Sequence, residues 1–153
     1  CKNGLNANVR VLSGLGQVLV EFKALTANAS TFRRVSRVSC NMALPVKVPA
    51  GKKLVVSSAV LRGQKTINNG AVGTLTSEIF IPGRRSIREQ MPLQVGGAVG
   101  YSLNFGNGRL EGACGQDVVL RQNTSIFLRQ NGMRSSKASV AYSLIQVSLV
   151  SCR

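Results

Sequence analysis

The sequence contains no histidine and no tryptophan, and only 5 of its 153 residues are acidic. Histidine is the usual general acid or base near neutral pH, so its absence removes the most common agent of proton transfer. A Ser-His-Asp hydrolase is excluded outright, and the Gly-x-Ser-x-Gly motif is also absent. We therefore expect a protein that is not an enzyme.

A hydrolase that uses two carboxylates would have to draw on the few acidic side chains, which are Glu21, Glu78, Glu89, Glu111 and Asp117. Glu111 and Asp117 are the closest pair in the sequence, but they flank Cys114 and a glycine-rich turn. We interpret these carboxylates as isolated surface groups that pair with nearby basic side chains. A hydrolase built on Glu111 and Asp117 stays as an alternative.

Metal and nucleotide sites also lack their usual motifs. The cysteines form no Cys-x-x-Cys pair, and no histidine could complete a zinc site. The glycine-rich stretch 104–109 lacks the Lys-Ser/Thr ending of a phosphate-binding loop and is typical of a β-turn. No apolar run approaches the roughly 20 residues that span a bilayer. We expect no metal, no cofactor and no transmembrane segment.

The charge is strongly one-sided, with 20 Lys and Arg residues against 5 acidic ones and a formal net charge of +15. Most of these cations cannot be paired within one chain, so the surface should attract polyanions. Acidic polysaccharide, extracellular nucleic acid, an anionic envelope polymer such as teichoic acid, and anionic lipid are the possible partners. The alternative is that the charge only keeps the protein soluble.

Two Arg-Arg-x-x-Arg clusters and one lysine pair are the candidate polyanion-binding residues. They are Arg33, Arg34, Arg37, Arg84, Arg85, Arg88, Lys52 and Lys53. Guanidinium groups at this spacing can be presented to phosphates or carboxylates. A solvated basic loop is the alternative for each cluster. Stacking aromatics are scarce, so binding to nucleic acid would be mostly electrostatic.

The four cysteines are expected to form two disulfides, which indicates an oxidising compartment and a secreted or cell-surface protein. Three pairings are possible. Cys1–Cys40 and Cys114–Cys152 are favoured, because both link residues that flank candidate strands and close loops of similar size. Each disulfide should contribute roughly 3–4 kcal/mol. The chain begins with Cys1 rather than Met, so we expect a signal peptide to have been removed before it; an acylated Cys1 is the alternative.

Alternating apolar residues predict strands over residues 17–25, 35–48, 54–61, 71–81, 99–105, 117–121, 125–129 and 138–150. Turn signals separate them at 49–51, 68–70, 82–83, 96–97, 106–108 and 131–132. Pro45 and Pro49 should confine the second strand to a sheet edge or end it. Seven to nine short strands in one domain, residues 1–153, predict an all-β antiparallel β-sandwich, with barrel-like closure as an alternative.

Two triplets match the N-glycosylation pattern, beginning at Asn28 and Asn123. Such triplets arise often by chance, and they carry meaning only in a host that glycosylates.

Several short motifs follow one another in a distinctive order. They are Arg37-Val38-Ser39-Cys40-Asn41, Pro49-Ala50-Gly51, Arg62-Gly63, Gly70-Ala71-Val72-Gly73-Thr74 running on to Phe80, Cys114-Gly115, and a final Cys152. In this order the chain resembles a family of small secreted four-cysteine proteins of unknown function, common in fungi and also found in bacteria. The resemblance implies an all-β fold, and the family brings no established catalytic residues that could be carried over to this chain.

These observations predict a secreted or cell-surface, non-enzymatic structural or interaction protein that binds polyanionic material through a basic surface. Self-assembly into an extracellular filament or matrix is the alternative, because an apolar, β-rich chain with few acidic residues could pair strand edges between copies. A secreted basic toxin or antimicrobial protein is a further possibility that the sequence leaves open.

Overall fold

The fold is described from a computed structural model that covers Cys1, residues 7–106 and residues 108–153, without the side chain of Ser13. Its strands are β1 (Ala7–Leu12), β2 (Gln17–Ala29), β3 (Val35–Val46), β4 (Lys52–Ile67), β5 (Ala71–Phe80), β6 (Ser86–Pro92), β7 (Gly96–Phe105), β8 (Leu110–Glu111), β9 (Val118–Gln130) and β10 (Ser136–Ser151). A short 3₁₀ turn, η1 (Ser13–Leu15), joins β1 to β2.

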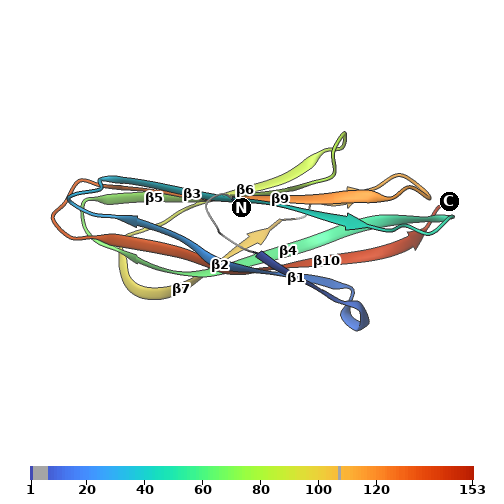
Figure 1. Cartoon of the computed structure of the whole chain (residues 1–153), viewed down its shortest axis with the longest axis horizontal. Helices are drawn as coiled ribbons and strands as arrows, with labels where there is room; N and C mark the ends of the chain where they lie inside the picture. The colour runs from blue at the N-terminus through green and yellow to red at the C-terminus, as the bar shows by residue number, and fades with distance from the viewer. Residues whose placement is uncertain (2–6, 107) are drawn as a thin grey trace.

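The strands form two antiparallel sheets that pack face to face (Figure 1). The larger sheet has the order β1-β2-β10-β4-β7, with β8 paired to β4, and the smaller has the order β3-β9-β5-β6. The predicted antiparallel β-sandwich is confirmed. Within the part of the chain that the structure describes, no ladder joins the two sheets, so the alternative of barrel-like closure is not adopted.

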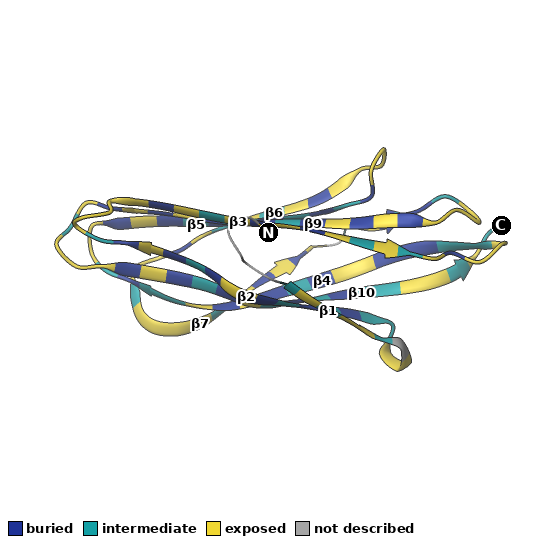
Figure 2. Cartoon of the chain, viewed as in Figure 1, coloured by how far each residue is buried: buried dark blue, intermediate teal, exposed yellow. Residues whose placement is uncertain are grey.

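The core lies between the sheets and is built by side-chain alternation along each strand. Val18, Val20 and Phe22 face inward from β2, as their spacing predicts. Leu75 and Ile79 do the same from β5. Figure 2 shows the resulting succession of buried and exposed positions along the strands. At about 25 cal/mol per Å² of buried apolar surface, these aliphatic rows supply the main driving force for folding.

The strand that contains Pro45 lies at an edge of the smaller sheet, as predicted. Pro45 pairs in register with Val119 of β9, and β3 has no neighbour on its other side in the sheet order. An edge strand tolerates proline because the N–H that proline lacks can face away from the sheet.

Some expected element boundaries were wrong. The expected strands 117–121 and 125–129 are one strand, β9. Gly96 and Gly97 open β7 instead of forming a turn, and three strands, β1, β6 and the two-residue β8, were not predicted. The polar triplet that starts at Asn123 looks like a strand break in the sequence. It continues the strand because Thr124 faces inward and finds a hydroxyl partner, Ser77 of β5, at 2.9 Å.

A polar cluster lies within the apolar core and links the two sheets. The amide nitrogen of Gln122, on β9, donates to the hydroxyl of Ser77 at 3.2 Å and to the hydroxyl of Ser143, on β10, at 3.0 Å. All three side chains are fully buried. Because unsatisfied polar groups are costly in a core, this cluster favours one alignment of the two sheets over slipped alternatives.

The Arg62-Gly63 motif has a packing explanation. Gly63 pairs with Tyr101 of β7, whose hydroxyl donates to the carbonyl oxygen of Ser139 at 2.6 Å. A Cβ atom on Gly63 would lie only 2.5 Å from the hydroxyl oxygen of Tyr101 and would collide with the Ser139 carbonyl. The ring of Tyr101 therefore occupies the space that any larger residue at position 63 would need.

Replacing Gln122 with Ala should lower the free energy of unfolding of the disulfide-intact protein by about 2–4 kcal/mol. The substitution leaves a cavity and removes the donor to Ser77 and Ser143. Denaturant titration followed by circular dichroism measures the change. Gln90→Ala on exposed β6 is the matched control and should change stability by less than about 0.5 kcal/mol. Equal stability of the two variants would contradict a structural role for the cluster.

Gly63→Ala should destabilise the protein by about 1–3 kcal/mol, since the added methyl group overpacks the contact between Tyr101 and Ser139. Gly97→Ala is the control, because nothing lies within 4 Å of a Cβ at that position. Thermal unfolding of both variants provides the comparison, and a Gly63→Ala protein that melts together with the wild type would refute the packing explanation.

Candidate binding surface

The structure places the two arginine clusters mainly at opposite ends of the sandwich. Arg33 and Arg34 lie before β3, whereas Arg84 and Arg85 lie in the turn after β5. Since β3 and β5 are both antiparallel to β9, they run in the same direction, and the start of one is far from the end of the other (Figure 1). These four side chains do not form one patch.

The third arginines of the two clusters, unlike the first two of each, lie on a shared surface. Arg37 on β3 and Arg88 on β6 both line a shallow depression of about 320 Å³ on the outer face of the smaller sheet. The complete lining consists of Arg37, Ser39, Asn41, Thr76, Glu78, Arg88, Asn123, Thr124 and Ser125. Every strand of this sheet contributes, so the depression exists only because the sheet is assembled.

Two polar rows cross the floor of the depression at right angles to the strands. The register aligns Ser39, Ser125, Thr76 and Gln90 in one row. The neighbouring row contains Asn41, Asn123, Glu78 and Arg88. Directly opposed Cβ atoms in such rows lie about 4.5–5.5 Å apart, so hydroxyl, amide and charged groups that can bind a polar ligand lie close together.

An arginine and a phenylalanine stand beside each other on both sides of these rows. Arg37 opposes Phe127 of β9 on one side, and Arg121 opposes Phe80 of β5 on the other. Sequence reasoning missed the two phenylalanines and the polar rows. A signal for the polar rows was present in the sequence, because the polar residues Arg37, Ser39 and Asn41 alternate with the apolar residues Val38, Cys40 and Met42.

The outer face of the smaller sheet is electropositive. It carries Arg37, Arg88, Arg121 and Arg129, and Glu78 is the carboxylate among the residues that line the depression. Across the described ranges, ion pairs engage other cations and none of these four arginines. Their guanidinium groups are therefore available to an anionic ligand.

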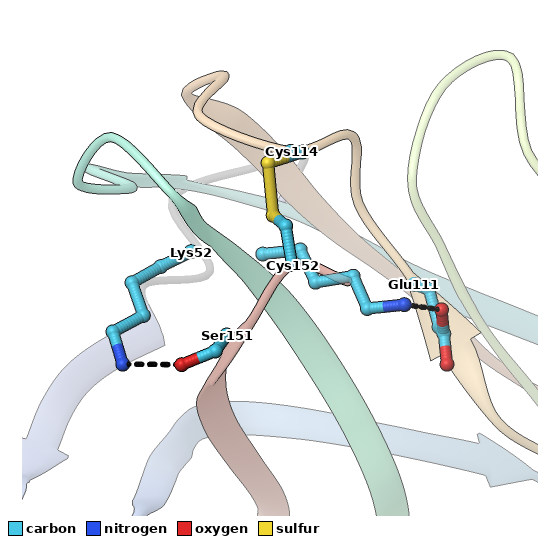
Figure 3. The surroundings of a disulfide bond; sticks show 6 residues. Lys52, Glu111, Cys114, Ser151 and Cys152 are labelled. Atoms are coloured by element: carbon cyan, nitrogen blue, oxygen red, sulfur yellow. Dashed lines mark hydrogen bonds and ion pairs between the residues drawn. A yellow bond between two sulfur atoms is a disulfide. The ribbon is translucent and has the colours of Figure 1, made fainter.

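The lysine pair predicted as a binding element lies elsewhere, beside the second disulfide (Figure 3). Lys53 forms an ion pair with Glu111 at 2.5 Å, and the amino group of Lys52 donates to the hydroxyl of Ser151 at 2.9 Å. Arg109 also contacts Glu111, at 2.7 Å. These cations are engaged in local contacts at the end where β4, β8 and β10 meet.

The carboxylates of Glu111 and Asp117 are held by different basic partners. Hydrogen bonds from Lys53 and Arg109 lower the pKa of Glu111. A hydrogen bond from Lys47 at 2.7 Å, helped by the backbone N–H of Val48, lowers the pKa of Asp117. Both groups are thus stabilised in the ionised form. This is the opposite of the raised pKa that a general-acid carboxyl group needs.

The cysteines pair as Cys1–Cys40 and Cys114–Cys152, which is the pairing that the sequence favours. The first disulfide ties the N-terminus to the middle of edge strand β3, and the second ties the end of β10 to the segment after β8. In the described residues, no group of three or more His, Cys, Asp or Glu side chains is placed to hold a metal ion.

The two glycosylation triplets fall in different settings. Asn28 is exposed near the end of β2, whereas Asn123 is half-buried on the central strand β9 and lines the depression. Glycosylation acceptors usually lie in surface loops, and Asn123 does not. Over the described ranges, the structure also has no helix of the length and apolar character that a membrane span requires.

Comparison with known families finds one match. The family described as "Domain of unknown function (DUF4360)" matches residues 1–150, nearly the whole chain. None of the curated proteins matches.

Solved structures with a similar arrangement include the enzymatically active domain of bacteriophage CBA120 tailspike protein 4, with 10% identity and a TM-score of 0.35 over 95% of this chain. TmCBM61 in complex with β-1,4-galactotriose shares 8% identity over 98% of this chain and 90% of its own length, with a TM-score of 0.33. Infectious bursal disease virus (Gx strain) gives 12% identity over 97% of this chain and a TM-score of 0.34. This chain spans only 18% of the tailspike chain and 34% of the viral chain.

Acid should destabilise the protein partly through Asp117. Its pKa is lowered in the folded state, so the unfolded chain takes up the proton first and stability falls as the pH drops from about 5 through the folded pKa. Asp117→Asn should lower the melting temperature slightly at pH 6. The effect should shrink as the pH falls through the folded pKa, because Asp117 then becomes protonated in both states. A difference from wild type that stays constant across this range would contradict the ion-pair explanation.

Proposed function

The chain belongs to the DUF4360 family, a domain family of unknown function. We propose that it is a secreted, non-enzymatic protein that binds an acidic polysaccharide on the outer face of its smaller sheet. The single observation that supports this most strongly is the convergence of Arg37 and Arg88 on one depression lined by amides and hydroxyls. Two arginines that lie 51 residues apart in the sequence share a surface that no single cluster supplies.

The chemistry of the face suits an acidic sugar chain. Guanidinium groups bind carboxylates or sulfates through paired N–H donors. The Ser, Thr and Asn side chains in the two rows can both donate to and accept from sugar hydroxyls. The depression is open and shallow, so a polymer could pass across it without a chain end having to enter.

Among polyanions, a polysaccharide fits the face better than a nucleic acid. Glu78 lies in the middle of the depression, where it would repel the closely spaced phosphates of a duplex but could accept hydrogen bonds from sugar hydroxyls. Phe80 and Phe127 stand on opposite sides of the two polar rows, so they do not form a continuous platform for successive bases.

Secretion is supported by the two disulfides, because such bonds persist in oxidising compartments. A non-enzymatic role is supported by the absence of histidine and by the engagement of Glu111 and Asp117 with structural partners. A protein that only binds needs neither a general acid nor a nucleophile.

The double variant Arg37→Ala/Arg88→Ala should bind heparin at least tenfold more weakly than wild type, as expected for the loss of two charge-assisted contacts. Its matched control is Arg84→Ala/Arg85→Ala, which removes the same charge from the exposed turn after β5. Calorimetry or surface plasmon resonance at about 50 mM salt measures both, with DNA as a second ligand.

Equal losses in the two variants would mean that binding follows net charge alone and would overturn the proposed site. Failure of the wild type to be retained on either heparin or DNA at low salt would overturn polyanion binding as a whole. Tighter binding to DNA than to heparin would reject the polysaccharide.

Self-assembly is a second candidate function, favoured by the character of β7. This strand is an edge of the larger sheet, and residues 93–108 contain no charged side chain in a chain with 25 of them. Val99 is exposed on it. An edge that lacks charge and proline can pair with the edge of another copy.

If β7 mediates assembly, Val99→Lys should shift the protein to monomer, because a charge at the edge opposes pairing between copies. Val119→Lys is the control, since Val119 is an exposed valine on β9, which belongs to the smaller sheet and not to the β7 edge. Sedimentation velocity from about 1 to 100 μM measures the state, and a wild type that remains monomeric throughout would rule out this second function.

A further inference from the structure

Four connections between the sheets lie side by side at one end of the sandwich. They are residues 30–34 between β2 and β3, 131–135 between β9 and β10, 68–70 between β4 and β5, and 93–95 between β6 and β7. The strands that they join are neighbours in both sheets, in the orders β2-β10-β4-β7 and β3-β9-β5-β6. The four connections therefore form one surface, here named the loop end, which lies opposite the C-terminus (Figure 1).

The loop end carries apolar side chains that project into solvent. Phe32 is 101% exposed and Met133 is 92% exposed, the two highest values among the large apolar side chains of the described residues. Val95, on a third connection, is 55% exposed. Much of this end of the molecule is drawn in yellow, as exposed, in Figure 2. A fully exposed phenylalanine keeps its whole apolar surface in contact with water. Burial of that surface against a binding partner would be favourable.

Backbone hydrogen bonds hold these connections in place. The backbone N–H of Ser30 donates to the carbonyl of Arg33 at 2.9 Å, and the N–H of Arg33 donates back to the hydroxyl of Ser30 at 3.1 Å. Phe32 is thus carried on a closed turn. The N–H of Asn131 donates to the carbonyl of Gly70 at 2.8 Å, which joins two neighbouring connections.

Met133 and Val95 share one hollow between the connections. Together with Arg134 they line a depression of about 520 Å³. Met133 and Val95 therefore border an open hollow, whereas Phe32 stands on a connection that does not line it.

The charge of the loop end is entirely positive. Arg33, Arg34 and Arg134 lie on the same connections as Phe32 and Met133, and these four connections contain no carboxylate. Arg129 and Lys137 are exposed just beside them, at the end of β9 and the start of β10. Fully exposed apolar tips beside several cations combine the two attractions, hydrophobic and electrostatic, that bind proteins to anionic bilayers.

We propose that the loop end docks on an anionic lipid bilayer, with Phe32 and Met133 inserted among the headgroups and Arg33, Arg34 and Arg134 on the lipid phosphates. This surface is separate from the depression on the smaller sheet, and it would leave that face free to hold a polysaccharide. The protein would then connect a charged polymer to a membrane surface.

A lipid surface fits better than a folded protein partner. A specific protein interface buries about 800 Å² on each side in closely packed contact, whereas Phe32 and Met133 stand on separate connections. A fluid bilayer accommodates separate tips. Phenylalanine is among the apolar side chains that bury at the boundary between headgroups and acyl chains, and arginine can reach phosphate while its aliphatic part covers apolar surface.

The absence of tryptophan from the chain allows a direct test. In Phe32→Trp the single tryptophan should shift its emission to shorter wavelength when vesicles of 30% phosphatidylglycerol and 70% phosphatidylcholine are added. It should not shift with pure phosphatidylcholine vesicles. Leu15→Trp is the control, since exposed Leu15 precedes β2, about 40 Å along that strand from the loop end, and its emission should stay unchanged.

Vesicle co-sedimentation then separates the contribution of the inserted apolar side chains from that of the arginines on the lipid phosphates. Phe32→Ala/Met133→Ala should weaken partitioning at least tenfold. Arg33→Ala/Arg34→Ala should weaken it similarly and reduce the preference for anionic lipid. Arg84→Ala/Arg85→Ala, with the same loss of charge at the other end, should retain most of the binding.

No emission shift in Phe32→Trp, or equal effects of the two arginine variants, would overturn the proposal. A shift that occurs without vesicles as protein concentration rises would show that a second copy covers the loop end, and would overturn it also. Arg37→Ala/Arg88→Ala should leave vesicle binding intact, so failure on heparin and failure on vesicles are distinguishable.

Discussion

The alternation of side chains along antiparallel strands is the constraint on which the rest of this structure depends. Once Cys40 and Met42 of β3 face the core, Arg37, Ser39 and Asn41 must face outward. Apolar side chains also face inward on β9, β5 and β6, and the register of these strands aligns their outward side chains into rows. A slip of one residue in any strand would exchange core and surface, so the apolar core specifies the composition of the outer face.

The motifs that carry the family resemblance mainly describe the fold. Gly63 makes room for the ring of Tyr101, and Gly70 adopts a positive φ of 81° in the turn before β5. Cys40 and Cys152 each hold one end of the chain against the sandwich. Arg37 is different, because it lies in a motif but touches the outer depression. Membership of the family therefore implies the scaffold, and function has to be inferred from the surfaces.

In three parts of the molecule, basic side chains lie beside different kinds of neighbouring groups. At the disulfide end, Lys53 and Arg109 are engaged with Glu111. On the outer face of the smaller sheet, Arg37 and Arg88 accompany hydrogen-bonding groups. At the loop end, arginines accompany exposed apolar tips. Some of the cations behind the net charge of +15 thus form stabilising ion pairs. Others lie on two surfaces, one beside hydrogen-bonding side chains and one beside exposed apolar side chains.

Sequence alone determined the class of fold, the inward residues of β2 and β5, and the edge position of the strand with Pro45, because these follow from local periodicity and from the lost N–H of proline. It also identified the arginine clusters, without showing that Arg33 and Arg34 lie far from Arg84 and Arg85. Only the tertiary structure decided which arginines share a surface, since Arg37 and Arg88 come together through the pairing order β3-β9-β5-β6. Strand order depends on contacts between distant segments, such as Gln122 with Ser143, and no local pattern contains it.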